Sequence, residues 1–183
     1  MNDTYDEREL LTKARPSARH PARTLCCDVS ENDDDVGSGL SRTMREVYGD
    51  HPLPDDKIVV HFRGKAGDGF GNGLGPGITF VADAIGKQGC SKMTGGRAVL
   101  LSLPEDEFCR GLTGGLVYVY AAGSDLPLAS GAFNVAKLNP SEKEQIRALI
   151  EEHGLLTESA HAHHILENWD SAAGGFVRVT AAA

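Results

Sequence analysis

Two segments of the chain repeat one order of polar, glycine and apolar positions. Met93-Thr94-Gly95-Gly96 precedes the apolar run 98–101, and Leu112-Thr113-Gly114-Gly115 precedes the apolar run 117–120. The offset is 19 residues, since 114 − 95 = 19. Each unit predicts a glycine turn leading into a β-strand, and a constant offset predicts strands stacked as the rungs of a solenoid. We therefore expect structural corners at Gly95, Gly96, Gly114 and Gly115, where φ is positive or adjacent rungs approach closely.

A second pattern, alternating polar and apolar residues followed by dense glycine, lies upstream. The run 57–63 alternates as a half-buried strand does, and glycine occupies every second position from Gly67 to Gly77. The glycines resemble those of a phosphate-binding loop, but neither G-x-G-x-x-G nor the P-loop motif is present. Pro76 also removes an amide donor that a phosphate cradle would use. We therefore predict another solenoid corner here and no cofactor-binding residues.

Helical patterns flank this strand-rich region. In the entry segment, apolar residues share one face of a short helix at 40–48, and the stretch before it is expected to be irregular. In the tail, Asn139, Pro140 and Glu142 are the start signals of a helix that we expect to end at Gly154. A second tail helix is expected at 157–169.

These elements predict a mainly β protein, a right-handed parallel β-helix (solenoid) with flanking short helices and a helical C-terminal tail. We divide the chain into an entry segment at 1–56, a glycine-repeat β-helix at 57–138, and a helical tail with a terminal strand at 139–183. The length of 183 residues is enough to bury a sizeable core, about 70% of the unfolded surface.

Composition narrows the functional classes. A formal net charge of −8 disfavours nucleic acid and anionic membranes as partners. No apolar run approaches the roughly 18 residues of a membrane span, and the acidic N-terminal residues do not resemble a signal peptide. The cysteines form no C-x-x-C pair, which is simplest to reconcile with a reduced, cytoplasmic setting. Cys90 and Cys109 are also 19 residues apart, so we expect them to stack in the core as packing residues.

No residue cluster predicts chemistry in this chain. His161, His163 and His164 gather in the second tail helix, but a zinc site would need two further ligands from elsewhere. No nucleophile elbow is present, and spacing alone indicates no Ser, His and Asp arrangement. We therefore predict no catalytic residues and no metal site.

The ordered motifs of the chain resemble the C-terminal GXGXG domain of the glutamate synthase large (alpha) subunit. The resemblance runs from about residue 6 to near the end, and it depends on the shared order of motifs that are individually weak. The principal motifs are Gly64-Lys65-Ala66-Gly67, Phe70-Gly71, Gly77-Ile78-Thr79, Gly86-Lys87-Gln88-Gly89-Cys90, Met93-Thr94-Gly95-Gly96, Gly111-Leu112-Thr113-Gly114-Gly115, Glu151-Glu152-His153, Thr157-Glu158-Ser159 and Asn168-Trp169.

The chain departs from this family in two places. Asp68-Gly69 stands where the family usually has Gln-Ser, and the family carries several further rungs between the positions matching Gly77-Ile78-Thr79 and Gly86. The solenoid therefore resembles an internally shortened one. We expect the shortening to leave an open end that exposes strand edges, and hence self-association into a homo-oligomer or dependence on a partner.

The resemblance implies a role within glutamate synthesis from glutamine and 2-oxoglutarate. In the family, an N-terminal cysteine performs the glutaminase reaction, and a domain with flavin mononucleotide (FMN) and an iron-sulfur cluster performs the amination. The sequence begins Met1-Asn2 and lacks a cysteine run for a cluster, so both cofactors are expected in partner domains. We expect a non-catalytic structural or assembly component that works with glutaminase and FMN-domain partners. The alternatives are a stand-alone interaction or regulatory module with a β-helix, and a degenerate fragment without activity.

Overall fold

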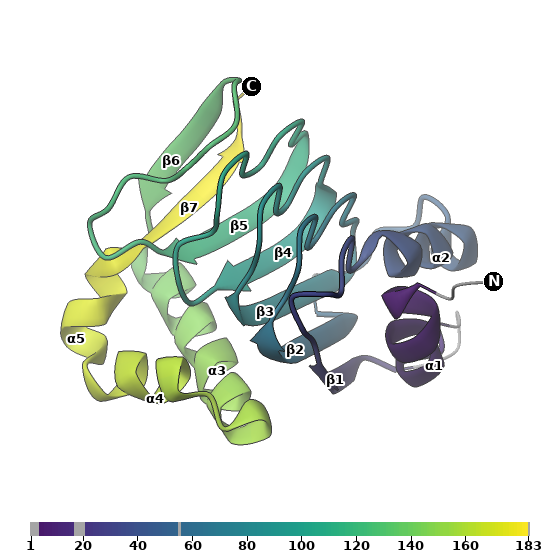
Figure 1. Cartoon of the computed structure of the whole chain (residues 1–183), viewed down its shortest axis with the longest axis horizontal. Coiled ribbons are helices and arrows are strands. Elements are labelled where there is room, and N and C mark those ends of the chain that lie inside the picture. Colours follow the sequence, from purple (N-terminus) through teal and green to yellow (C-terminus); the bar gives the residue numbers. More distant parts are fainter. Residues whose placement is uncertain (1–3, 17–20, 55, 183) are drawn as a thin grey trace.

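The sheet of this protein is a stack of parallel rungs closed by an antiparallel pair. The computed structural model describes residues 4–16, 21–54 and 56–182, so Met1 and Asn2 lie outside the described residues. In these ranges, seven strands form one sheet in the order β1-β2-β3-β4-β5-β7-β6 (Figure 1). The strands are β1 Arg23–Asp28, β2 Ile58–Lys65, β3 Ile78–Ala84, β4 Thr94–Leu100, β5 Gly114–Tyr120, β6 Phe133–Lys137 and β7 Phe176–Ala181. The predicted mainly β solenoid with flanking helices and a helical tail is confirmed.

The entry segment contributes a rung, contrary to the prediction that it is irregular before its helix. Strand β1 pairs in parallel with β2 from Arg23↔Ile58 to Asp28↔Arg63. Its sequence shows little alternation, and most of its residues stay partly exposed. The strand forms because β2 offers it a row of backbone donors and acceptors, and such pairing outweighs a weak local preference.

The helix predicted at 40–48 is confirmed as α2, Ser38–Tyr48, and its beginning is held by a distant carboxylate. Asp6 accepts hydrogen bonds from the backbone N–H groups of Gly37 (2.8 Å) and Leu40 (2.7 Å). Asp6 lies in a π-helical turn, Asp6–Leu10, that continues into α1, Leu11–Ala14. A buried carboxylate at a helix N-terminus satisfies donors that have no partner within the helix. The contact fixes the N-terminal helical segment against α2.

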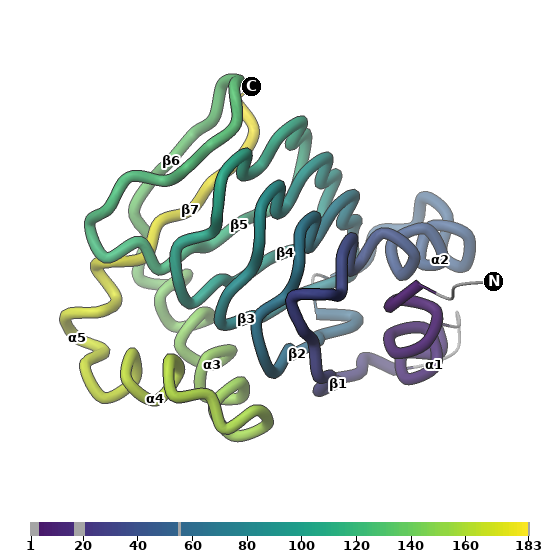
Figure 2. Tube along the Cα trace, in the orientation of Figure 1, coloured from purple at the N-terminus to yellow at the C-terminus, as the bar shows by residue number. Residues whose placement is uncertain are grey.

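Opposite the sheet, the rungs stack through left-handed backbone. Gly71, Cys90 and Cys109 have φ of 74°, 55° and 64° at a constant offset of 19 residues. Their N–H groups donate to the preceding rung, as from Cys90 N to Phe70 O at 2.7 Å and from Cys109 N to Gly89 O at 2.9 Å. Figure 2 shows these corners as stacked zigzags. The same conformation recurs in two flanking ladders, made of Gly69, Gln88 and Glu107 and of Gly73, Lys92 and Gly111.

The glycine doublets lie at the beginnings of β4 and β5, where the pairing register shifts between Thr94 and Arg97. Only the second glycine of each doublet has positive φ, 72° at Gly96 and 86° at Gly115. Gly95 and Gly114 therefore do not have positive φ. A Cβ on Gly114 would instead lie 2.4 Å from the carbonyl oxygen of Thr94. The first glycines are required by the close approach of adjacent rungs.

The sheet separates two hydrophobic cores. The inner core lies between the sheet and the corners, and there the rings of Phe62, Phe70 and Phe80 have centroids 4.9 to 5.3 Å apart. The outer core lies between the other face of the sheet and the tail helices (Figure 1). In it, Val99 and Tyr118 of the sheet share a cluster with Ile146, Ile150 and Phe176 of the tail.

The first tail helix, α3, is Pro140–Thr157 and begins with the predicted capping box between Asn139 and Glu142. It does not end at Gly154, contrary to the prediction, but continues for three residues. Gly154 is buried, and a Cβ there would lie 3.2 Å from the ring of His163. The glycine thus allows close packing of the next helix. The tail continues through α4 Ala160–Glu167, α5 Trp169–Ala172 and a 3₁₀ turn, Ala173–Gly175.

The stack is continuous at the place where the sequence resembles an internally shortened solenoid. Strand β3 pairs directly with β4, from Thr79↔Arg97 to Ala82↔Leu100. Each rung contacts only its neighbours, so whole rungs can be absent without opening the stack. The stack therefore has no gap between β3 and β4, and the edge strands of the described sheet are β1 and β6. Among the described helices, none is both long and apolar enough to cross a bilayer.

The contact between rungs predicts different costs for two chemically identical substitutions. Gly115 and Gly123 have nearly equal φ, 86° and 85°. A Cβ on Gly115 would lie 2.5 Å from the carbonyl oxygen of Gly95, whereas Gly123 has nothing within 4 Å. We expect Gly123→Ala to lower the free energy of unfolding by about 1 to 2 kcal/mol, the cost of left-handed backbone. We expect Gly115→Ala to lower it by at least about 2 kcal/mol more, because the backbone must also shift.

Urea denaturation of both variants beside the parent measures these costs. Equal losses in the two variants would show that backbone strain alone, and not the approach of adjacent rungs, demands glycine at Gly115.

Candidate functional site

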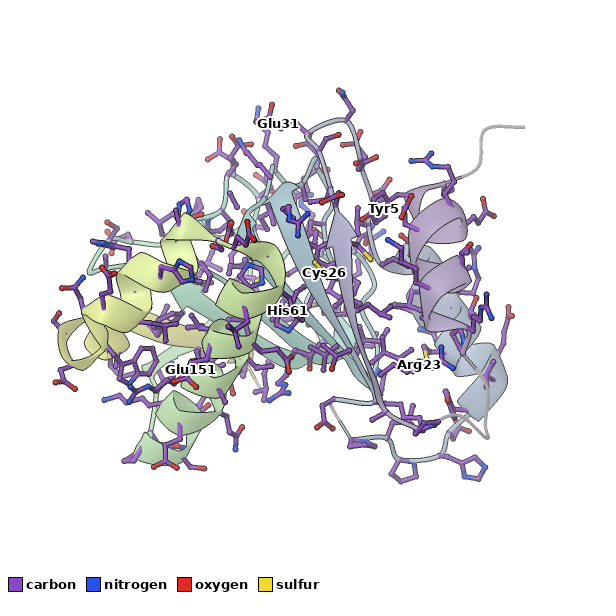
Figure 3. All side chains as sticks on the ribbon, turned by 90° about the horizontal axis from the view of Figure 1, so that it is seen from below. Tyr5, Arg23, Cys26, Glu31, His61 and Glu151 are labelled. Atoms are coloured by element: carbon purple, nitrogen blue, oxygen red, sulfur yellow. The ribbon has the colours of Figure 1, made fainter. Side chains whose placement is uncertain are left out.

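A chain of buried and half-buried polar groups joins the sheet to the helical tail. We call it the histidine clamp and define it as His61 of β2, Asp83 of β3, Glu152 and His153 of α3, and Ser159, the N-cap of α4. Figure 3 shows His61 between the sheet and α3. Both histidine side chains are fully buried. The clamp is a strong candidate site because buried titratable groups that contact one another are uncommon outside functional or switching sites.

The contacts of the histidine clamp run in series. His61 Nε2 lies 2.6 Å from Glu152 Oε1, and His61 Nδ1 lies 3.0 Å from His153 Nδ1. His153 Nε2 then lies 3.0 Å from Asp83 Oδ1, which also accepts a hydrogen bond of 2.6 Å from the Ser159 hydroxyl. The hydroxyl accepts in turn from Ala162 N at 3.0 Å, capping α4. One line of contacts thus connects two strands with two helices.

The pKa shifts at the two ends of the clamp have different dominant causes. Burial lowers the pKa of His61, and the hydrogen bond to Glu152 opposes this shift. At the other end, burial alone would raise the pKa of Asp83, but hydrogen bonds from His153 and Ser159 outweigh it and hold that pKa below its usual range. Asp83 is therefore ionised at neutral pH, and its charge lies beside His153.

Solvent reaches the clamp through Glu152, whose side chain is 43% exposed. This residue lines a hollow of about 540 Å³ between α3 and the neighbouring strands. Thr24 and Val59 of the sheet, together with Arg97, form the wall opposite the helix. Of the five clamp residues, Glu152 is the one that lines this hollow.

The predicted site residues lie elsewhere. A Cβ added to any of the four doublet glycines would lie less than 3.0 Å from neighbouring backbone or from Pro76. Cys90 and Cys109 are free, buried thiols in the inner core, and burial raises the pKa of Cys90 to about 12, which makes it unreactive. His161 and His164 line a separate apolar hollow of about 300 Å³ beside Leu101. Among the described residues, no group of three or more potential ligands is arranged to hold a metal ion.

Sequence reasoning missed the histidine clamp because its members are far apart in the chain. His61 and His153 are 92 residues apart, and each fitted a regular element without needing a partner. A signal was nevertheless present. His153 lies on the apolar stripe predicted for the first tail helix, and His61 lies between the apolar residues Val60 and Phe62 of a predicted strand.

Comparison with known proteins gives the family. The pattern of the GXGXG motif family matches residues 76–182, which is more than half of the chain. The match runs from just before β3 to the end of β7. The chain belongs to the GXGXG motif family.

Three of the relatives that the chain matches are named as glutamate synthases. The chain is 29% identical over 178 residues to the glutamate synthase [NADPH] large chain of Bacillus subtilis, covering 85% of this chain and 11% of that protein. It is 25% identical over 254 residues to the glutamate synthase [NADH] of Schizosaccharomyces pombe, covering 97% and 12% respectively. It is 40% identical over 110 residues to the glutamate synthase [NADPH] large chain of Azospirillum brasilense, covering 58% and 7%. The chain thus spans about a tenth of the length of these relatives.

The alignment with the Schizosaccharomyces pombe protein is longer than the chain itself. It covers 254 positions, and the chain has 183 residues, so at least 71 positions have no counterpart here (254 − 183 = 71). The length difference agrees with an internally shortened solenoid.

The clamp predicts that Ser159 is more important for stability than an ordinary surface serine. Ser159→Ala removes a helix cap, worth about 1 kcal/mol, and a hydrogen bond to a charged carboxylate, worth about 1.5 to 3 kcal/mol. We expect the free energy of unfolding to fall by at least about 2 kcal/mol in urea denaturation. Ser171→Ala is the matched control, because its exposed hydroxyl donates only to Asn168 O, and it should change stability by less than about 0.5 kcal/mol. Indistinguishable losses would mean that Asp83 does not need Ser159.

Proposed function

We propose that this chain is a non-catalytic structural or assembly component of a glutamate-synthase-like enzyme that makes glutamate from glutamine and 2-oxoglutarate. The observation that carries the proposal is the match between a short chain and about a tenth of glutamate synthase large chains, located in a region that folds as a stacked solenoid. A stack whose rungs are fixed by backbone contacts is well suited to hold other domains at a constant distance.

The proposed partners are a glutaminase domain and an FMN domain with an iron-sulfur cluster. In this arrangement the solenoid holds the two domains so that ammonia released by one reaches the other. The buried polar side chains described above support a structural role, because they form hydrogen bonds with one another. FMN and the cluster are assigned to the partner domains, and the chemistry of both half-reactions is assigned to them as well.

The proposal predicts an inactive chain. We expect the purified protein to show no glutaminase activity, no glutamate formation and no bound flavin or iron. Absorption spectroscopy and metal analysis after gel filtration measure this directly. A yellow chromophore with flavin absorption that stays with the protein would assign cofactor binding to this chain and overturn its non-catalytic role.

Assembly is tested by supplying the partners. We expect the chain to form a defined complex with the glutaminase and FMN-domain polypeptides encoded by the same genome. Gel filtration with light scattering, for the chain alone and for the mixture, measures this complex. Binding to the folded chain should also raise its melting temperature by mass action. If the chain elutes as an unchanged species beside both polypeptides, a stand-alone interaction or regulatory module is the better account.

A further inference from the structure

The contacts of the histidine clamp require a definite number of protons. Three contacts lie in series, from Glu152 to His61, from His61 to His153, and from His153 to Asp83. Each is short enough to be a hydrogen bond, and a hydrogen bond needs one proton between its two heavy atoms. If both carboxylates are ionised, they only accept, and all three protons then come from the imidazole rings.

With both carboxylates ionised, only one protonation state of the two rings satisfies all three contacts. Two neutral imidazoles carry two N–H protons in total. When each ring donates its Nε2 proton to a carboxylate, both Nδ1 atoms are unprotonated, and their lone pairs face each other at 3.0 Å. Two charged imidazoles carry four protons, so two N–H groups would point at each other. Three protons place one N–H on each carboxylate and one between the two Nδ1 atoms.

We propose that His61 and His153 share one buried proton at neutral pH, and that this proton makes the attachment of the helical tail to the sheet pH-sensitive. The charge lies mainly on His153, which is the neighbour of the ionised Asp83 and is itself fully buried. The lowered pKa of His61 agrees with a neutral ring on that side. The proposed charge states, in order along the clamp, are a Glu152 carboxylate, a neutral His61 imidazole, a His153 imidazolium and an Asp83 carboxylate.

The groups around the pair favour this arrangement. Two carboxylates, Glu152 from α3 and Asp83 from β3, contact the rings and compensate the positive charge. His161 of α4 acts electrostatically on Asp83, and Arg97 of β4 lines the hollow with Glu152. On the edge-strand side, Cys26 is the register partner of His61, and its thiol faces the carbonyl of Leu156. The remaining nearby cation, Arg63 of β2, bonds to the same carbonyl and to Asp28.

The proton count fixes the sign of the pH dependence. Below about pH 6.5, the two histidines of the unfolded chain bind two protons and those of the folded chain bind one, so stability falls as the pH falls. Above about pH 6.5, the unfolded chain binds none and the folded chain still holds one, so stability falls as the pH rises. A pair of neutral imidazoles would instead give stability that rises with pH and then levels.

The test is urea denaturation of the full chain between pH 5.5 and 8. We expect maximal stability near pH 6.5 and an increase of about eightfold in the unfolding equilibrium constant from pH 6.5 to pH 8, from the linkage of one net proton. His153→Gln should remove this alkaline loss, while His164→Gln, an exposed histidine of the same tail, should retain it. Cys27 does not account for the alkaline loss below pH 8. Burial raises its pKa to about 11, so its ionisation in the unfolded chain lowers stability only above the pKa of a free thiol. Both variants also keep this cysteine.

The result that would overturn the proposal is stability of the parent that rises to a plateau above pH 7, or an alkaline loss that is equal in His153→Gln. A second measurement needs no variant. In the ¹⁵N-histidine-labelled chain, which has seven histidines, we expect one buried ring with both nitrogens protonated at pH 7.5 and coupled to Nδ1 of another ring. Unprotonated Nδ1 atoms on both His61 and His153 would also overturn it.

Discussion

Backbone-to-backbone stacking at the solenoid corners is the interaction on which the rest of the structure depends. At each corner, residues with positive φ donate their N–H groups to an adjacent rung, and the rungs come so close that a Cβ on Gly115 would lie 2.5 Å from the Gly95 carbonyl oxygen. The corner ladder of Gly71, Cys90 and Cys109 repeats every 19 residues, and β4 pairs with β5 at offsets of 20 and then 19 residues. The register of the strands places one face of the sheet against the inner core and the other against the tail helices.

The sequence predicted those parts of the fold whose signals are local. The doublets, the strand at 57–63 and the capping box at Asn139 each follow from a few neighbouring residues. The corner ladders were only partly visible, because Cys90 and Cys109 adopt the left-handed conformation without being glycine, held there by hydrogen bonds between rungs. Strand β1 and the histidine clamp depend on partners distant in sequence, and no local pattern encodes such pairing.

The modular stack explains how a short chain can keep the family fold. Because β3 pairs directly with β4, every strand of this chain keeps its neighbours, although the alignment with the Schizosaccharomyces pombe protein is longer than the chain. What must be kept is the attachment of the tail, whose helices cover the outer face of the sheet. The buried contact between His61 and His153 adds a polar link to the outer core in that attachment, and it is the contact that we propose responds to pH.

Amide hydrogen exchange of the isolated chain, resolved by residue, tests most directly whether the corners are the rigid centre of the fold. If stacking holds the rungs, the N–H groups of Gly71, Cys90 and Cys109 should be protected as strongly as those of β3 and β4, and they should exchange only when the whole domain unfolds. Exchange at these amides at the rate of surface loops, with the strands still protected, would contradict the account. It would show that the sheet stays folded without stable hydrogen bonds at the corners.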